Sequence, residues 1–328
     1  MNEVANSAAN NLQAVDARTA NAQIAGAQIV DAHAANVQIA DTQTVNAQPA
    51  PIRATCPICP HACSLAEGQR GICRARVARN GKVIDENYGR VTSLALDPIE
   101  KKPLARFMPG SSILSIGSYG CNMACGFCQN ASIAQANARD VTWNHLEPAA
   151  IADTAAAFTA QGNVGVAYTY NEPLVGFEFV RDCSQAVHDR GLVNVLVSNG
   201  QVKADPLTEL LPLIDAANID LKGFTEETYR ALGGDLQTTL HTIKEFARNP
   251  TTHLEVTMLI VPGLNDSREH LVEAARWLAG LDPSIPLHIT RFFPCYKMAN
   301  AKPTSIETIY SFVDEARSFL NFVTCGNC

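Results

Sequence analysis

Three cysteines in one short loop are the first residues in this sequence whose types and spacing suit chemistry. In the stretch GSYGCNMACGFCQN, Cys121, Cys125 and Cys128 are separated by three and then two residues. Structural zinc normally takes four protein ligands, and the loop offers no fourth at zinc-finger spacing. Three thiolates instead suit a [4Fe–4S] cluster that keeps one iron open to bind a substrate or cofactor.

A second group of cysteines precedes this loop. Cys56, Cys59, Cys63 and Cys73 are separated by two, three and nine residues, and His61 lies among them. Prolines and glycines between them favour turns. Four soft ligands joined by turns can close around zinc or hold an auxiliary iron–sulfur cluster. The sequence does not separate these two metals, and a set of thiols that binds nothing is the third alternative.

The remaining cysteines are more scattered. Cys183 lies in a helical pattern, VRDCSQAVHD, and is predicted to be a small core residue. Cys325 and Cys328 form a C-x2-C pair at the end of the chain. Three interpretations stay open for this pair: solvent-facing thiols of a frayed terminus, metal ligands or a redox-active dithiol acting with Cys295, or completion of the N-terminal cysteine group.

Strands and helices alternate from residue 112 onward. Short apolar runs rich in β-branched residues predict strands at 112–118, 164–170, 192–198, 216–221, 254–261 and 286–292. Helical patterns occupy 148–161, 174–190, 205–214, 226–248 and 267–280. This alternation predicts an α/β fold with a parallel sheet. Six units are too few for a closed eight-stranded barrel, so we expect an open, partial TIM-like (β/α)6 barrel.

In such folds the functional residues gather in the loops after the carboxyl ends of the strands. Six loops are therefore expected to meet at one rim. They contain the cysteine loop, Asn171-Glu172-Pro173, Ser198-Asn199-Gly200, Asp220 with Lys222, Val261-Pro262-Gly263 and Phe293-Pro294-Cys295.

The C-x3-C-x2-C loop, with Phe127 before its last cysteine, resembles the signature of the radical S-adenosylmethionine (SAM) superfamily. The resemblance implies that the open iron binds the amino and carboxylate groups of SAM. A second-strand motif of that superfamily, often Gly-Gly-Glu-Pro, receives the amino group. Here YTYNEPL places Asn171, Glu172 and Pro173 at that position, with Glu172 as the acceptor, although both glycines are absent.

Two further motifs resemble SAM-contacting segments of glycyl-radical-enzyme activases. These are Ser198-Asn199-Gly200 and the DLK stretch that contains Asp220 and Lys222. The resemblance implies that Lys222 pairs with the SAM carboxylate, while Asp220 binds SAM or orients the lysine. The plainer alternative is an ordinary ion pair at a strand end. The VPGLND turn at Val261 would lie against the adenosine.

A narrower resemblance extends from about Cys56 to Met298. The stretches CPICPHACSLAEGQRGICRAR, YGRVTSLALDPIEKKPLARFMPG and HITRFFPCYKM are similar to radical SAM proteins of the AmmeMemoRadiSam system, relatives of the pyruvate formate-lyase activating enzyme. Two departures concern thiols: Cys295 replaces an expected Asp, and the chain stops at TCGNC.

The resemblance implies reductive cleavage of SAM, with electrons from a flavodoxin- or ferredoxin-like donor. The resulting 5′-deoxyadenosyl radical would abstract hydrogen from a small-molecule or protein substrate inside the barrel. One alternative is an activase that makes a glycyl radical on a partner protein. Another, from a different class, is a non-catalytic iron–sulfur electron carrier.

Composition sets the outer limits of these hypotheses. The chain has 328 residues, of which 47% are hydrophobic and 17% charged, and its net charge of −7 argues against general nucleic-acid binding. It contains no apolar stretch near the ~20 residues of a membrane span. Without a recognisable secretory signal, we expect a cytoplasmic protein.

Four segments are predicted along the chain. Residues 1–50 contain pentads such as ANAQI and AGAQI, without bulky central residues, and are predicted to be a low-complexity, disordered tail. A Cys-rich N-terminal extension is expected over 51–105 and the barrel over 106–298. A C-terminal helix and a cysteine-containing tail are expected over 299–328.

Overall fold

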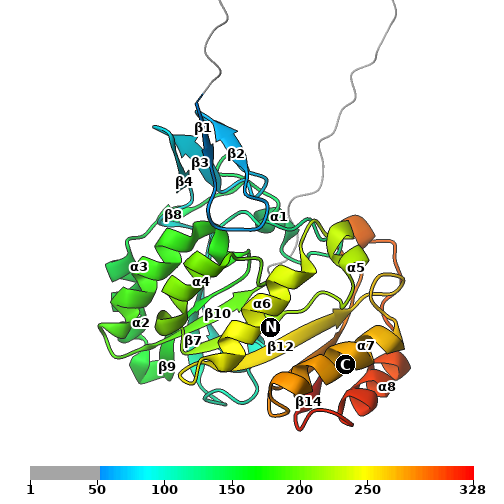
Figure 1. Ribbon diagram of the computed structural model, residues 1–328. Coiled ribbons are helices and arrows are strands. Elements are labelled where there is room, and N and C mark those ends of the chain that lie inside the picture. The colour runs from blue at the N-terminus through cyan, green and yellow to red at the C-terminus, as the bar shows by residue number, and fades with distance from the viewer. Residues whose placement is uncertain (1–51) are drawn as a thin grey trace, which may run out of the picture. The chain divides into compact units, whose positions relative to one another are not determined.

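The computed structural model describes residues 52–328, so the disordered tail predicted over residues 1–50 lies outside the described residues. An eight-stranded sheet forms the centre of this part of the chain (Figure 1). Six adjacent parallel strands of this sheet confirm the predicted strands and the partial barrel. They are β7 (Ser112–Gly117), β9 (Asn163–Tyr168), β10 (Val193–Ser198), β11 (Ala216–Asp220), β12 (His253–Ile260) and β13 (Leu287–Arg291).

One further strand lies at each edge of this sheet. β6 (Ser93–Pro98) pairs antiparallel with β7, and β14 (Val323–Gly326) pairs in parallel with β13. The sheet therefore extends on both sides beyond the barrel range of 106–298 that the sequence suggests. Because β6 runs opposite to β7, the chain returns to the amino end of the barrel before β7 begins.

Amphipathic helices cover the outside of the sheet. Figure 1 shows α2 (Pro148–Ala157), α3 (Phe177–His188) and α4 (Ala204–Leu210) packed near one another on the half that contains β9 and β10. The helices of the other half are α6 (Leu236–Arg248), α7 (Arg268–Leu281) and α8 (Ile306–Ala316). Their apolar faces are buried in the core, with Ile243 and Phe246 of α6 fully enclosed. Among residues 52–328, no helix is both long and apolar enough to cross a bilayer.

The segment 226–248, predicted as one helix, is two. α5 (Glu226–Ala231) ends before Gly233, whose φ of +70° lies in the left-handed region that terminates helices. α6 then begins with Asp235 as its N-cap, whose side chain accepts a hydrogen bond from the Thr238 amide. Local capping chemistry thus overrides the continuous apolar pattern.

The N-terminal extension consists of two small antiparallel hairpins. β1 (Arg53–Thr55) pairs with β2 (Ser64–Ala66), and β3 (Arg76–Arg79) pairs with β4 (Lys82–Asp85). Asn80 and Gly81 both have positive φ values between β3 and β4, as in a tight hairpin turn. Figure 1 shows both hairpins gathered beyond one end of the sheet. β5 (Arg90–Val91), which follows the hairpins, pairs antiparallel with β8 (Asn144–His145), which lies between β7 and β9 in the chain order.

Glu255 of β12 closes the amino end of the barrel. Its fully buried carboxylate accepts hydrogen bonds from the amides of Ala105 (3.0 Å) and Arg106 (2.8 Å), in the loop that follows β6. His253 and His288 also lie within hydrogen-bond distance of its two oxygens. Burial alone would raise the pKa of Glu255, but the two histidines and the two amides outweigh it and lower the pKa to about 2.

Candidate functional site

The cysteine loop begins directly after β7, at the carboxyl end of the barrel. Gly120 leads into it with a φ of +91°, and the Cys121 amide then donates to the Cys73 carbonyl at 3.2 Å. The Cys128 amide donates to the Cys125 carbonyl (3.3 Å), which turns the loop back on itself. Phe127 is buried beneath this turn.

Glu172 links the loops that follow the second and third strands of the barrel. Its Oε1 atom accepts from the Leu174 amide (3.0 Å) and the Ser198 hydroxyl (2.8 Å), while Oε2 accepts from the Asn199 amide (2.8 Å). Burial is the chief reason that the pKa of Glu172 is raised to about 7, against the effect of these three donors. The nearby charge of Asp220 acts in the same direction as burial.

Asn199 reaches the cysteine loop directly. Its Nδ2 atom donates to Cys121 Sγ (3.6 Å) and to Asn122 Oδ1 (2.9 Å), and Asn122 Nδ2 donates to the Gln201 carbonyl (2.9 Å). Hydrogen bonds to a ligating sulfur help to set the reduction potential of an iron–sulfur cluster. Sequence reasoning missed Asn122 and Gln201. The only signal for either residue was that it is polar and directly follows a motif residue, Cys121 for Asn122 and Gly200 for Gln201.

Asp220 and Lys222 form an ion pair at the end of β11, with Lys222 Nζ 2.7 Å from Asp220 Oδ2. Burial would lower the pKa of Lys222, but the charge and hydrogen bond of Asp220, together with the charges of Cys125 and Tyr229, outweigh burial, so this pKa is raised and the ammonium persists. Asn265 Nδ2 donates to the Lys222 carbonyl (2.8 Å), and Asn265 Oδ1 accepts from the Val261 amide (2.7 Å). Val261 is fully buried. Asn265, which was not predicted from the sequence, thus links the turn that contains Val261 to Lys222.

The cysteine loop lies in an asymmetric field. Burial raises the pKa of Cys121, and the negative charge of Glu172 adds to it. Burial also raises the pKa values of Cys125 and Cys128, but the positive charge of Lys222 opposes burial at both sulfurs. The charge of Asp220, the ion-pair partner of Lys222, acts in the same direction as burial at these two sulfurs. The loop therefore has the carboxyl group of Glu172 acting on Cys121, and both charges of the Asp220–Lys222 pair acting on Cys125 and Cys128.

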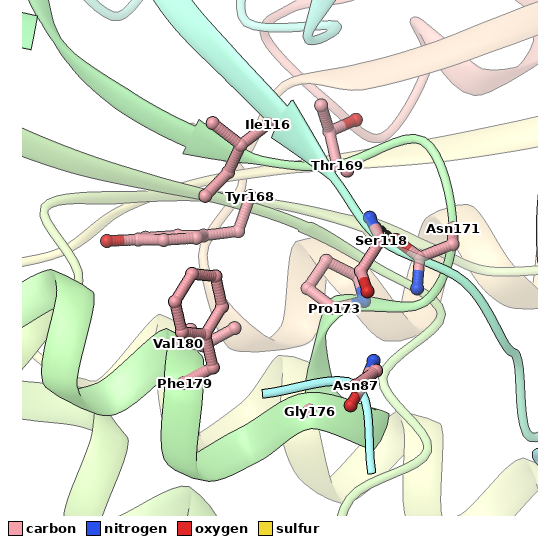
Figure 2. Close-up of a pocket in the computed structure, with 11 residues that line it drawn as sticks. Asn87, Ile116, Ser118, Tyr168, Thr169, Asn171, Pro173, Gly176, Phe179 and Val180 are labelled. Carbon is pink, nitrogen blue, oxygen red and sulfur yellow. Dashed lines mark hydrogen bonds between the residues drawn. The ribbon is translucent and has the colours of Figure 1, made fainter. Parts of the chain in front are cut away.

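Asn171, predicted as a cofactor ligand, bonds to two backbone groups of the turn before the cysteine loop. Its Oδ1 atom accepts from the Ser118 amide (2.9 Å), as Figure 2 shows, and its Nδ2 atom donates to the Gly120 carbonyl (3.1 Å). Both ends of the amide thus hold the turn that leads into the cysteine loop. The pocket in Figure 2 lies between this turn and α3, and its largely apolar lining contains no loop cysteine, Glu172 or Lys222.

The four N-terminal cysteines come together beside the loop. Cys56, Cys59 and Cys73 are buried and Cys63 is partly exposed. The Cys56 amide donates to the Cys63 carbonyl at 2.9 Å. A Cβ atom added to Gly71 would lie 3.6 Å from Cys63 Sγ and 3.7 Å from Cys73 Sγ, so both sulfurs border the same space.

The other cysteines have separate surroundings. Cys183 is fully buried in α3, as predicted for a core residue. Cys295 donates from Sγ to the Phe127 carbonyl (3.0 Å) and so contacts the cysteine loop. Cys325 and Cys328 form a disulfide with each other, which leaves neither sulfur free to complete the N-terminal group.

The donor set of the cysteine loop fits a cluster better than a single zinc ion. Structural zinc takes four protein ligands, whereas three thiolates suit a [4Fe–4S] cluster that keeps one iron open.

Comparison with known proteins agrees with this chemistry. The family model of the radical SAM superfamily matches residues 115–278. An uncharacterized protein of Methanocaldococcus jannaschii is 38% identical over 258 residues, which are 78% of this chain and 76% of the relative. Pyruvate formate-lyase 1-activating enzyme of Escherichia coli K12 is 28% identical over 207 residues, covering 58% of this chain and 82% of that enzyme.

Solved structures share the fold. The crystal structure of Streptococcus suis SuiB bound to S-adenosylmethionine superposes with a TM-score of 0.52 at 14% identity, covering 66% of this chain and 52% of that one. The same protein bound to its precursor peptide SuiA gives a TM-score of 0.52 at 15% identity, covering 70% of this chain and 51% of that one. At these identities the likeness concerns the arrangement of strands and helices.

Proposed function

Because the chain belongs to the radical SAM superfamily, whose members use a [4Fe–4S] cluster and SAM, we propose that it is an enzyme that cleaves SAM reductively at the cysteine loop. When bound, the cluster supplies one electron that splits SAM into methionine and a 5′-deoxyadenosyl radical, which takes a hydrogen atom from the substrate. The protein's part is to hold, orient and shield these groups.

One observation carries this proposal: the Glu172 carboxyl group and the Asp220–Lys222 ion pair both act on the cysteine loop. Glu172 acts on Cys121, while Lys222 acts on Cys125 and Cys128. In our proposal Lys222 binds the carboxylate of SAM, and Asp220 keeps the lysine protonated and oriented. Glu172 faces the amino group, and its raised pKa of about 7 falls when that cation arrives.

The other predicted residues take positioning roles in this proposal. Asn199 donates to Cys121 Sγ, and Ser198 fixes the carboxyl group of Glu172. Asn171 shapes the turn before the loop. Phe127 packs under the loop, and the buried Val261 supports the turn beside Lys222 that we assign to the adenosine. We assign the electron supply to a flavodoxin- or ferredoxin-like protein.

A second candidate, favoured by one relative, concerns the substrate. The 28% identity to the Escherichia coli enzyme that activates pyruvate formate-lyase 1 supports an activase that forms a glycyl radical on a partner protein. A small-molecule substrate inside the barrel is the other possibility within the same chemistry. The two differ in whether the hydrogen atom comes from a protein backbone, which a deuterated partner glycine would report.

The test is anaerobic reconstitution with iron, sulfide, dithionite and SAM, followed by chromatography for 5′-deoxyadenosine. We expect the wild type and Cys183→Ala, which changes a cysteine inside the core, to produce it. Cys125→Ala should produce none, because it removes a ligand of the cluster. A wild type that yields no more 5′-deoxyadenosine than Cys125→Ala would overturn the proposal and leave the electron-carrier interpretation.

A further inference from the structure

We propose that Cys56, Cys59, Cys63 and Cys73 hold a second iron–sulfur cluster, which passes electrons to the cluster of the Cys121 loop. This inference goes beyond cleavage of SAM, since it concerns a separate metal centre built by the N-terminal extension. It depends on the cysteine loop holding its own cluster, and on nothing else in the proposed reaction.

The four thiols share one site. Backbone hydrogen bonds bring three of the four cysteines together: the Cys56 amide donates to the Cys63 carbonyl (2.9 Å), and the Ala62 amide donates to the Cys59 carbonyl (3.1 Å). Cys73 joins them beside Gly71. The Cβ position of Gly71 lies beside both Cys63 Sγ and Cys73 Sγ, so any side chain larger than that of glycine would project into the space next to these two sulfurs.

A buried donor without a hydrogen-bond partner lies close to these cysteines in the chain. The Arg76 side chain is only 2% exposed. Its two terminal nitrogens donate hydrogen bonds to the carboxylate of Glu178, both at 2.6 Å. Its Nε atom has no hydrogen-bond partner among the described residues. The charge of Cys56 contributes to the raised pKa of Arg76, and the charge of Arg76 opposes the effect of burial on the pKa of Cys73. A buried N–H that is left without an acceptor is costly, and a cluster sulfide would accept it.

The contact with the Cys121 loop favours a cluster over zinc. Zinc has no redox chemistry, whereas an iron–sulfur cluster carries electrons. The Cys73 carbonyl accepts a hydrogen bond from the Cys121 amide, so a redox-active centre at this place would adjoin the cluster of the loop.

The backbone joins this site to the first cluster. The Cys121 amide donates to the Cys73 carbonyl (3.2 Å), so a ligand of one centre is hydrogen-bonded to a ligand of the other. His61 Nε2 adds a contact to the Asn122 carbonyl (2.8 Å). A Cβ atom on Gly120 would lie 2.5 Å from the Cys73 carbonyl oxygen, so only glycine permits this approach.

The opposite side of the four-cysteine site reaches the surface. Cys63 is partly exposed, and the neighbouring Ile72 is 53% exposed. A one-electron carrier protein of the flavodoxin or ferredoxin class would reduce the second cluster at this side. The second cluster would then pass the same electron to the first and return to its oxidised state, with no bond made or broken and no proton moved.

Metal content tests the site itself. In a Cys121→Ser/Cys125→Ser/Cys128→Ser variant, purified without oxygen, we expect about four irons and four sulfides per chain and no zinc. Adding Cys59→Ser should remove them. In the otherwise unchanged chain, Cys59→Ser should lower the iron content from about eight to about four, which covers the case in which the triple variant does not fold. One zinc per chain, or no metal at the second site, would overturn the proposal.

Paramagnetic resonance tests the connection. In the dithionite-reduced wild type we expect a spectrum that differs from the sum of the two single-cluster spectra, because adjacent spins interact. Gly120→Ala should weaken that interaction by displacing Cys73. Gly162→Ala is the matched control, since Gly162 also has a positive φ but no atom lies within 4 Å of its added Cβ. A wild-type spectrum equal to the simple sum refutes the electron path. Neither measurement uses SAM cleavage, so its result is independent of the proposed reaction.

Discussion

At the scale of single residues, the Lys222 ammonium is the strongest positive charge that acts on the cysteine loop. We predict that Lys222→Ala raises the dissociation constant for SAM at least tenfold, because a charge-assisted hydrogen bond contributes about 1.5–3 kcal/mol and each 1.4 kcal/mol is a factor of ten. Equilibrium dialysis of the cluster-loaded protein measures this constant. Lys302→Ala, which alters an exposed lysine, should leave it unchanged. An unchanged constant in Lys222→Ala would reduce the Asp220–Lys222 pair to an ordinary ion pair at a strand end.

Motif spacing located most residues around this lysine but not their contacts. The sequence placed Glu172, Ser198 and Asn199 on loops that meet, and the structure joins all three through the Glu172 carboxyl group. It did not indicate that Asn199 would reach Cys121 Sγ or that Asn265 would hold Lys222. Such contacts depend on side-chain direction and on packing between distant loops, which periodicity does not encode.

At the scale of elements, Glu255 shows how one strand fastens a loop. The pKa of this carboxyl group is lowered from 4.5 to about 2 in the folded protein, although burial opposes the change. Above about pH 4.5 the folded and unfolded states are both ionised, and the stabilisation is complete. As the pH falls from about 4.5 towards 2, the unfolded state binds a proton first, so this stabilisation is lost.

We therefore predict that Glu255→Gln lowers the free energy of unfolding by about 3 kcal/mol at pH 7, the equivalent of the pKa shift. The difference from the wild type should shrink as the pH approaches 3. Urea titrations of cluster-free protein, followed by circular dichroism, measure both values. Glu227→Gln, at an exposed position, is the control. If the difference in the free energy of unfolding stays constant with pH, the shape of the side chain at position 255, and not its charge, explains the loss of stability.

The alternation of strand and helix patterns predicted which elements form more reliably than it predicted which strands pair with one another. All six strands predicted from the β-branched runs lie where those runs placed them, because a buried parallel strand leaves a strong apolar signal. The short strands of the N-terminal hairpins leave no such signal. The membership of β6 and β14 in the sheet is decided by pairing with distant strands, so no local pattern could reveal it.

At the scale of the whole molecule, the C-terminal disulfide is separate from both cysteine sites. Cys325 lies in β14 opposite Ile289 and bonds to Cys328, whereas Cys295 contacts the cysteine loop. We predict that Cys325→Ser/Cys328→Ser leaves the iron content and the yield of 5′-deoxyadenosine unchanged. The free energy of unfolding should fall by about 2 kcal/mol at most, because the bond closes a very short loop.

Metal analysis, chromatography and urea unfolding of the double variant give these three values. The wild type treated with a mild reductant is the control, since it opens the bond without changing a side chain. A loss of iron or of 5′-deoxyadenosine in the variant would instead assign the pair to turnover, as the redox-active interpretation of these cysteines proposes.

The hydrogen bond from Cys121 to the Cys73 carbonyl also bears on how the chain matures. Translation delivers the hairpins of residues 53–85 well before the loop at 121–128, and chains generally fold from the amino end as they are synthesised. The carbonyl that receives Cys121 is therefore in place when that cysteine emerges.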